Sequence, residues 1–300
     1  MTSIAYESPP PRRSLGRRVA SFLYRHPRAQ VSLLLATPLG WLVIAYLGSL
    51  GVLFAAAFWR LDPFTANIVR DPGLQNFKTL VENDVYRSIT IRTVKIAAAV
   101  TLTDAVLAFP IAYYMARIAT PRVKGLLVVA ILMPLWSSYL VKVYAWRVIL
   151  QENGALNWAL SPLGLHGPGF GEVAMWLVFS YLWLPYMILP LYAGLERIPE
   201  SLVEASGDLG ARGSRTFRSV ILPLALPALV AGSIFTFSLT LGDFITPNLV
   251  SSVQFIGNVV YANVGVANNL PLASAFATVP VLIMIVYLLL AKRLGAFESL

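Results

Sequence analysis

Long apolar runs alternate with short polar segments along most of the chain. Six runs approach or exceed the about 20 residues that a membrane-spanning helix requires. With approximate boundaries, these predicted spans are residues 31–58, 93–116, 125–143, 173–195, 220–241 and 274–291. The pattern predicts an all-α integral membrane protein with six transmembrane helices.

Prolines and single charges interrupt some of these runs. Pro134 falls inside the third predicted span, and Pro185 and Pro190 fall inside the fourth, where each should kink the helix because it leaves a carbonyl without its donor. The second span includes Lys95 near its start and Asp104 near its middle. An unpartnered carboxylate at that depth costs about 2.5–3.5 kcal/mol on insertion scales. We therefore expect Asp104 to face protein or water.

The distribution of basic residues orients the spans. Of the 23 lysines and arginines, 15 lie in the four segments that the six spans place on one side of the membrane. Because cytoplasmic segments are enriched in basic residues, both termini are predicted to be cytoplasmic. The expected organisation is a basic tail at 1–30, a six-span domain at 31–294, and external segments at 59–92, 151–172 and 242–273, with a surface helix in the first of these from Leu74 to about Val85.

The least membrane-like stretch between two spans runs from Pro199 to Pro223. As a helix from Pro199 to Leu209, it would be acidic on one face and apolar on the other. The acidic face holds Glu200, Glu204 and Asp208, and the apolar face holds Leu202, Ala205 and Leu209. Gly210 is suited to the left-handed conformation that ends a helix. Since Arg212, Arg215 and Arg218 follow, we predict a short helix, a glycine turn and a basic helix.

This stretch resembles the EAA loop of the membrane-spanning permease subunits of bacterial ATP-binding cassette importers. In that family a Glu-Ala-Ala triplet is followed at fixed spacing by a glycine and then by Ile-x-Leu-Pro. Here Glu204, Ala205 and Ser206 occupy the triplet, Gly210 falls at the expected spacing, and Val220, Leu222 and Pro223 close the pattern. Ser206 replaces alanine and Val220 replaces isoleucine. An amphipathic helix that merely connects two spans is the simpler alternative.

The resemblance implies that residues 199–223 seat on a separate ATPase subunit and transmit ATP-driven motion into the membrane. The residues expected to couple in this way are Glu204, Ala205, Ser206, Asp208, Gly210, Arg212, Arg215 and Pro223. The partner ATPase would bind ATP and Mg, so no cofactor is expected in this chain.

Composition excludes several other classes. The chain is 57% hydrophobic and only 12% charged, about half the charge of soluble domains. Its net charge of +9 comes from residues that flank the spans, which is the pattern of membrane orientation and not of nucleic-acid binding. The phosphate-binding loop of an ATPase requires a lysine directly after a glycine, and this chain has none. His26 and His166 lie far apart in sequence, which argues against a metal site or a histidine-based catalytic triad. The chain is therefore predicted not to be an enzyme.

Further stretches resemble the spermidine/putrescine permeases of the same importer family. They are Gly242-Asp243-Phe244-Ile245-Thr246-Pro247, Ile256-Gly257-Asn258 and Ala267-Asn268-Asn269-Leu270-Pro271-Leu272. Permeases for opines, other amino compounds or ferric iron are similar there, so these substrates stay open. The resemblance implies an inner-membrane complex of this chain with a second, homologous permease, two ATPase subunits and a periplasmic solute-binding protein, importing by alternating access.

A cationic solute would need carboxylates or aromatic faces along its path. The candidates are Asp243 at the external mouth, Asp104 at mid-depth, and Trp136, Tyr139 and Trp146 at the external rim. The simpler interpretations are a contact between helices for Asp104 and a helix-terminal contact for Asp243. We expect Asp243→Asn to impair uptake more than Asp104→Asn.

Two rival classes remain at this point. A stand-alone secondary transporter or channel is disfavoured by the scarcity of charges inside the spans. A membrane-embedded enzyme is disfavoured because the spans contain no nucleophile, metal-binding cluster or pair of acids.

Overall fold

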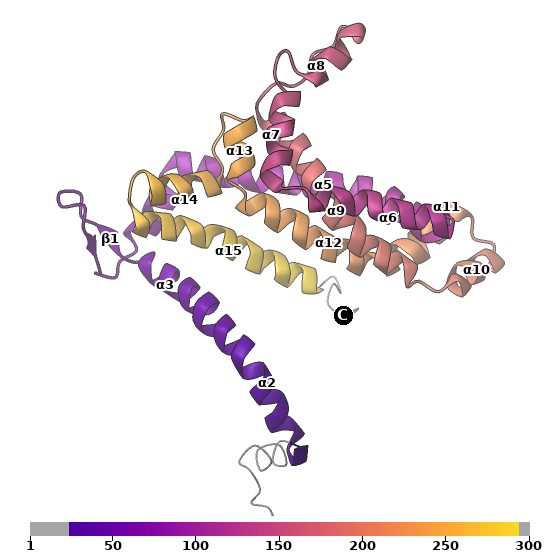
Figure 1. Cartoon of the computed structure of the whole chain (residues 1–300), viewed down its shortest axis with the longest axis horizontal. Helices are drawn as coiled ribbons and strands as arrows, with labels where there is room; N and C mark the ends of the chain where they lie inside the picture. The colour runs from indigo at the N-terminus through magenta and orange to yellow at the C-terminus, as the bar shows by residue number, and fades with distance from the viewer. Residues whose placement is uncertain (1–23, 294–300) are drawn as a thin grey trace, which may run out of the picture. The chain divides into compact units, whose positions relative to one another are not determined.

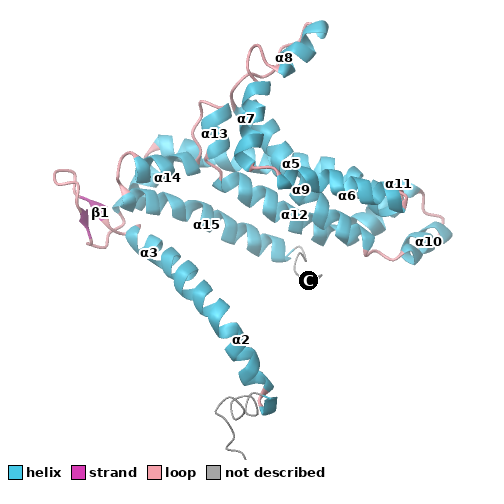
Figure 2. Ribbon diagram, viewed as in Figure 1, coloured by secondary structure: helices cyan, strands magenta, loops and turns pink. Residues whose placement is uncertain are grey.

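The computed structural model describes residues 24–293. These residues are predominantly helical, with one short hairpin (Figure 2). The chain divides into two compact units, Met1–Ala55 and Ala56–Leu300. Most of the tail expected at residues 1–30, and the last residue of the domain expected at 31–294, lie outside the described residues.

The first unit contains one continuous helical stretch. It comprises α2 (Pro27–Trp41), the π-helical turn η1 (Leu42–Leu47) and most of α3 (Gly48–Ala56). Its apolar side chains are exposed on all sides, Trp41 and Ile44 at 77% each. Such a helix is stable only against lipid or another membrane protein. It corresponds to the first predicted span.

Three helices form the centre of the second unit: α5 (Asp84–Arg117), α9 (Glu172–Glu196) and α12 (Leu222–Gly242) pack side by side (Figure 1). α9 is the most buried of the helices that are long enough to span a membrane. α15 (Leu270–Arg293) packs against α12 and against α14 (Ile256–Gly265).

Small residues allow α9 and α12 to approach closely. A Cβ added at Gly194 in α9 would lie 2.2 Å from the Cβ of Ala228 in α12. A Cβ added at Gly232 in α12 would lie 2.9 Å from the Sδ of Met187 in α9. These contacts are typical of helix packing in membranes, where small residues bring backbones together.

The all-α membrane fold is confirmed. Five helical segments in residues 24–293 are long and apolar enough to cross a membrane: Gln30–Ala56, Asp84–Arg117, Glu172–Glu196, Gly213–Gly242 and Leu270–Arg293. They contain the first, second, fourth, fifth and sixth predicted spans, apart from the last two residues of the first. α9 remains a single helix through Pro185 and Pro190.

The third predicted span differs from the prediction. In place of one helix over 125–143, α6 (Pro121–Trp136) and α7 (Tyr139–Ile149) are bent relative to each other by 92°. Ser137 and Ser138 between them are extended, and the Ser137 hydroxyl donates to the Pro134 carbonyl at 2.8 Å. Hydropathy missed this break because apolar residues continue on both sides of it. The pair counts as a sixth span only if both helices are taken together.

The segments between the spans contain more structure than expected. Strands β1 (Arg60–Leu61) and β2 (Ile68–Val69) form an antiparallel hairpin in the first of the segments predicted to be external. The predicted surface helix from Leu74 to Val85 is α4 (Gln75–Glu82). It ends at Asn83, whose side chain accepts a hydrogen bond from Val85 N and caps α5. α5 therefore begins nine residues before the predicted start of its span.

The other two segments also contain short helices. The segment at 151–172 contains α8 (Ala155–Leu160) and the 3₁₀ turn η2 (Ser161–Leu163). The segment at 242–273 contains α13 (Ile245–Val250) and α14.

Candidate functional site

The helix and the glycine turn predicted at residues 199–223 are present. α10 spans Glu200–Asp208, and Gly210 has a φ of +75°. The backbone N–H of Ala211 donates to Ser206 O at 3.0 Å, and that of Gly210 donates to Gly207 O at 2.8 Å. These bonds satisfy carbonyls at the helix end in the way that a left-handed glycine permits.

The basic helix after the turn is not a separate element. α11 (Gly213–Thr216) and the π-helical turn η3 (Phe217–Ile221) continue into α12, so that one helical segment runs from Gly213 to Gly242. The helix of the fifth span thus begins at Gly213, seven residues before the predicted start at residue 220. α11 and α12 thus belong to one helix, and residues 209–212 form the turn that separates α10 from it.

Ser206, which departs from the family pattern, makes a specific contact. Its hydroxyl lies 3.0 Å from the buried hydroxyl of Thr216 in α11. The contact links α10 to α11 across the turn. An alanine at position 206 could not form this hydrogen bond. The family pattern therefore did not predict that α10 and α11 are joined here.

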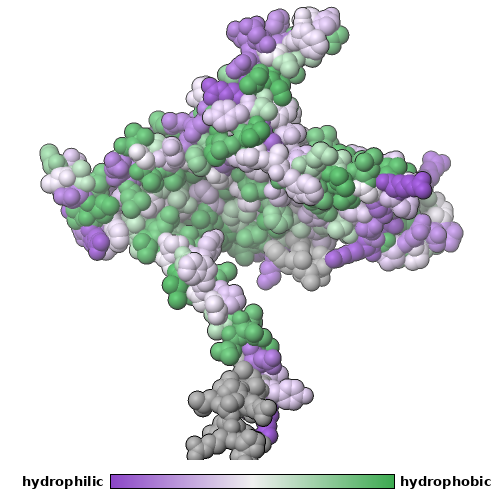
Figure 3. All heavy atoms as spheres, viewed as in Figure 1, coloured by the Kyte–Doolittle hydropathy of each residue, from purple (hydrophilic) through white to green (hydrophobic). Residues whose placement is uncertain are grey.

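The apolar side of α10 is open. Leu209 is 88% exposed and Leu202 is 45% exposed. With Ala205, Ser206 and Arg215 they line a groove of about 360 Å³ between α10 and α11. Glu204, Asp208 and Arg212 are exposed, and Pro223 lies exposed in the first turn of α12. Figure 3 shows hydrophilic side chains gathered at the end of the bundle where α10 and α11 lie.

Charged residues connect this loop to the bundle. The Arg117 guanidinium at the end of α5 donates to Leu195 O at 2.9 Å and to Ile198 O at 2.6 Å. Lys124 in α6 forms an ion pair with Glu196 at 2.8 Å. These contacts hold the ends of α5, α6 and α9 next to the loop. The sequence reasoning used Arg117 and Lys124 only for orientation and missed their contacts.

At the opposite end of α12, Asp243 is enclosed by donors. One carboxylate oxygen accepts from the backbone N–H of Ile245 at 2.7 Å and of Thr246 at 3.0 Å. The other accepts from the Tyr139 hydroxyl and from the Thr246 hydroxyl at 3.3 Å. Because Tyr139 is the first residue of α7, the Asp243 contact fixes α7 and α13 to the end of α12. The helix-terminal contact that was the simpler interpretation of Asp243 is present.

An aromatic pocket adjoins Asp243. The Tyr139 ring stacks on Trp183 of α9 with ring centroids 5.8 Å apart. Both rings and Asp243 line a pocket of about 350 Å³ together with residues 238, 239, 242, 244 and 245. Sequence reasoning missed Trp183, since nothing in the sequence of α9 distinguishes it from other apolar span residues.

The remaining path candidates do not join this pocket. Trp136 is 87% exposed at the end of α6. Trp146 packs against Tyr181, with ring centroids 5.5 Å apart. Of the five predicted path residues, the structure brings only Asp243 and Tyr139 into contact.

Asp104 is fully buried between helices, as expected for a carboxylate inside a span. Neither of its carboxylate oxygens forms a hydrogen bond with a described residue. The Ser180 hydroxyl of α9 lies close enough to influence it. Asp243 thus accepts four hydrogen bonds, whereas Asp104 accepts none from a described residue.

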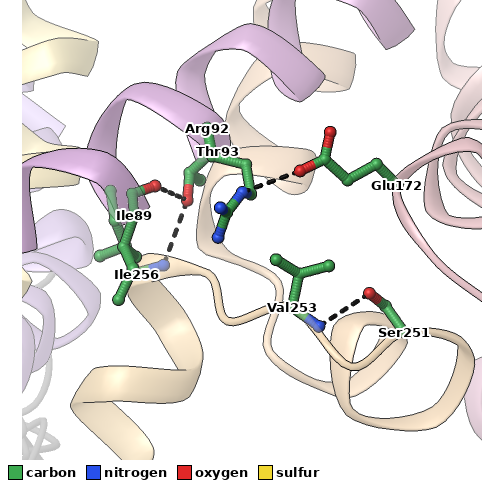
Figure 4. A network of polar contacts seen from close by, with 7 residues as sticks. All are labelled: Ile89, Arg92, Thr93, Glu172, Ser251, Val253 and Ile256. Atoms are coloured by element: carbon green, nitrogen blue, oxygen red, sulfur yellow. Dashed lines mark hydrogen bonds and ion pairs between the residues drawn. The ribbon is translucent and has the colours of Figure 1, made fainter. Parts of the chain in front are cut away.

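A second set of contacts joins helices near the start of α9, on the side of the bundle away from the coupling loop at 199–223 (Figure 4). Arg92 of α5 forms an ion pair with Glu172 of α9 at 2.8 Å. The Thr93 hydroxyl donates to Ile89 O at 2.8 Å and accepts from the N–H of Ile256 at 3.2 Å. These bonds connect α5, α9 and α14.

The structure combines a helical membrane fold with a helix–glycine–helix loop, and residues 24–293 contain no group of three or more metal-binding side chains. Residues 95–297 match the family described as binding-protein-dependent transport system inner membrane component. The chain belongs to this family of permease subunits of ATP-binding cassette importers, in which separate subunits hydrolyse ATP. A stand-alone carrier and a membrane enzyme are thereby excluded.

Two relatives are informative. The chain is 45% identical over 97% of both lengths to the inner membrane ABC transporter permease protein YdcU of Escherichia coli K12. It is 30% identical, over 67% of this chain and 72% of the relative, to the spermidine/putrescine transport system permease protein PotB of Haemophilus influenzae.

Solved structures show the same fold. A chain of the bacterial alginate ABC transporter in complex with an alginate pentasaccharide-bound periplasmic protein aligns with a TM-score of 0.70 at 15% identity. The alignment covers 93% of this chain and 97% of that chain. At this identity the likeness concerns the fold alone.

Proposed function

We propose that the permease imports a polyamine such as spermidine or putrescine, and that residues 199–223 couple this transport to an ATPase subunit. The coupling role is supported most directly by the geometry of the loop. α10 has an exposed apolar face and an acidic one, and α11, after the glycine turn, continues without a break into α12. A docked ATPase would cover the groove that Leu202, Ala205 and Leu209 line.

The polyamine substrate is supported by the similarity to PotB and by the pocket at Asp243. A polyamine carries several positive charges, and replacing their water requires carboxylates or aromatic faces. Asp243, Tyr139 and Trp183 provide both. The name of YdcU states no substrate. Other amino compounds, opines and ferric iron are the competing substrates, because permeases for them are similar in the stretches at 242–247, 256–258 and 267–272.

The proposed assembly consists of this chain, a second and different permease of the same family, two ATPase subunits that bind ATP and Mg, and a periplasmic solute-binding protein. It would lie in the lipid of the inner membrane with both termini of this chain in the cytoplasm. Alternating access between the two permeases would pass the solute inward.

The substrate is tested by ATP hydrolysis of the reconstituted complex with its binding protein. Spermidine, putrescine, an opine, an amino acid and ferric iron are each added separately. We expect the polyamines to give the strongest stimulation. Stimulation by an anionic solute alone would refute the polyamine proposal and leave the coupling proposal intact.

The substrate path is tested by comparing variants that neutralise Asp243 or Asp104 with a variant that keeps the charge of Asp243. Asp243→Asn should lower polyamine uptake more than Asp104→Asn, because the mouth must strip water from the arriving cation. Tyr139→Phe removes one donor to Asp243 but leaves its charge. If Tyr139→Phe lowers uptake as much as Asp243→Asn does, Asp243 positions α7 and does not contact the solute.

A further inference from the structure

The entrance of the coupling loop is held by a side chain from another helix. Residues 197–199 link the end of α9 to the start of α10. Arg117, the last residue of α5, donates from Nη2 to Ile198 O in this link at 2.6 Å and to Leu195 O at 2.9 Å. The link is therefore fixed to the end of α5 as well as to α9.

The chemistry of both partners makes this contact strong. The last carbonyls of a helix have no donor within the helix, and a cation next to them is stabilised by the helix dipole. A hydrogen bond from a guanidinium to a carbonyl is charge-assisted and is roughly twice as strong as one between neutral groups. Arg117 is half-buried, and Leu195 and Ile198 are buried, so water competes little for these bonds.

The other end of the coupling loop also packs against α5. Phe217, the first residue of η3, meets Phe109 of α5 edge to face, with ring centroids 5.2 Å apart. One buried cluster joins the end of α5 to residues on either side of α10: Ala112, Met115, Leu195, Ile198 and Ile221. α5 thus contacts the loop at both ends through side chains, whereas α9 and α12 are joined to it by the chain itself.

We propose that Arg117 is a positioning residue for coupling, which makes the end of α5 move together with the entrance of the coupling loop. Without the bonds from Arg117, a displacement of α10 would be absorbed by bending of the three linking residues. With them, the same displacement also moves α5, which packs against both α9 and α12. The proposal rests on the coupling function proposed for residues 199–223 and does not depend on the transported solute.

Two distances between spin labels separate motion of the loop from motion of α5. Cysteine pairs are introduced into the full chain, which has no cysteine of its own, and the complex with its partner subunits is measured in lipid nanodiscs without nucleotide and with ATP and vanadate. The pair Leu209→Cys with Leu290→Cys reports the position of the loop relative to α15. The pair Ile118→Cys with Leu290→Cys reports the end of α5.

The three labelled positions are at least 54% exposed, so the labels displace little packing within the chain. The unsubstituted complex, treated identically, gives the labelling background of the other subunits. The size-exclusion yield of each variant is compared with that of Arg122→Met to verify assembly.

With Arg117 in place, we expect both distances to change between the two states. Arg117→Met removes both hydrogen bonds, so the change in the Ile118 distance should be lost while the change in the Leu209 distance is retained. Arg117→Lys keeps a cation near the two carbonyls but lacks the planar fork, and should restore part of the Ile118 change. Arg122→Met removes an exposed charge at the start of α6 and should leave both changes intact.

An undiminished Ile118 change in Arg117→Met would overturn the proposal, because Arg117 would then only cap α9. Loss of both changes in this variant would overturn it too, since Arg117 would then be needed for docking of the ATPase and not for moving α5. If Arg117→Met does not assemble, Arg117→Lys decides: an Ile118 change smaller than in Arg122→Met supports the proposal, and an equal one contradicts it. If the loop does not move even with Arg117 in place, the coupling function of residues 199–223 fails, and this proposal fails with it.

Discussion

Gly210 is the residue at which backbone conformation most constrains the coupling loop. Its φ of +75° is unfavourable for other residues, yet a Cβ added there would meet no atom within 4 Å. Gly210→Ala should therefore act through the backbone alone, at a cost of about 1–2 kcal/mol. We expect the turn between α10 and α11 to loosen and solute-stimulated ATP hydrolysis to fall, while the yield of the complex stays close to normal.

Gly207 provides the matched control. It lies inside α10, and an added Cβ there also meets no atom within 4 Å. Gly207→Ala should stabilise the helix by about 0.5–1 kcal/mol because alanine loses less backbone freedom. Equal loss of stimulated hydrolysis in both variants would show that the left-handed turn has no special role.

Glu204 tests the proposed docking through charge. Glu204→Lys reverses an exposed charge in the acidic triplet position and should abolish uptake and stimulated hydrolysis, while insertion into the membrane is retained. Glu200→Lys introduces the same change one helical turn earlier, on the same face of α10. Wild-type uptake in Glu204→Lys, or a larger loss in Glu200→Lys, would contradict docking of this loop through Glu204.

The spacing of single residues predicted Gly210 well but could not predict tertiary partners. A left-handed residue follows from local sequence, since helix ends have local rules. The bond of Tyr139 with Asp243 joins residues 104 positions apart, and that of Arg117 with Leu195 joins residues 78 positions apart. No pattern in a single sequence connects such residues, so neither Trp183 in the pocket nor Thr246 as a donor to Asp243 was expected.

At the scale of elements, hydropathy predicted where helices cross the membrane but not where they begin or bend. The early starts of α5 at Asp84 and of the fifth span at Gly213 lie in polar sequence, where helix formation depends on the cap at Asn83 and the turn at Gly210. The bend between α6 and α7 lies in apolar sequence. Hydropathy measures burial in lipid and contains no information on direction.

The contact between α9 and α12 gives a prediction at the same scale. Gly194→Ala places a Cβ 2.2 Å from the Cβ of Ala228, so the helices must separate or shift. Overpacking of this kind costs about 1–3 kcal/mol. We expect the melting temperature of the purified complex to fall, as measured by the loss of its size-exclusion peak after heating.

The double variant Gly194→Ala with Ala228→Gly removes the clashing methyl group and should recover most of the lost stability. Ala228→Gly alone is the reference for the cost of a glycine inside α12. If the double variant is no more stable than the sum of the two single effects predicts, the two residues are not in contact in the assembled protein.

For the whole molecule, orientation in the membrane is the property on which the proposed coupling depends. The loop at 199–223 can meet an ATPase only if it is cytoplasmic, and positive-inside counting places it there. Ser214 is exposed in α11 and Ser161 is exposed in η2, whereas Ser251 is half-buried and its hydroxyl accepts from Val253 N. In intact cells an impermeant thiol reagent should label Ser161→Cys and not Ser214→Cys, and both should be labelled after the membrane is opened. Ser251→Cys should react in intact cells but more slowly than Ser161→Cys, because its side chain is partly covered. Labelling of Ser214→Cys from outside intact cells would invert the topology and exclude an ATPase at this loop.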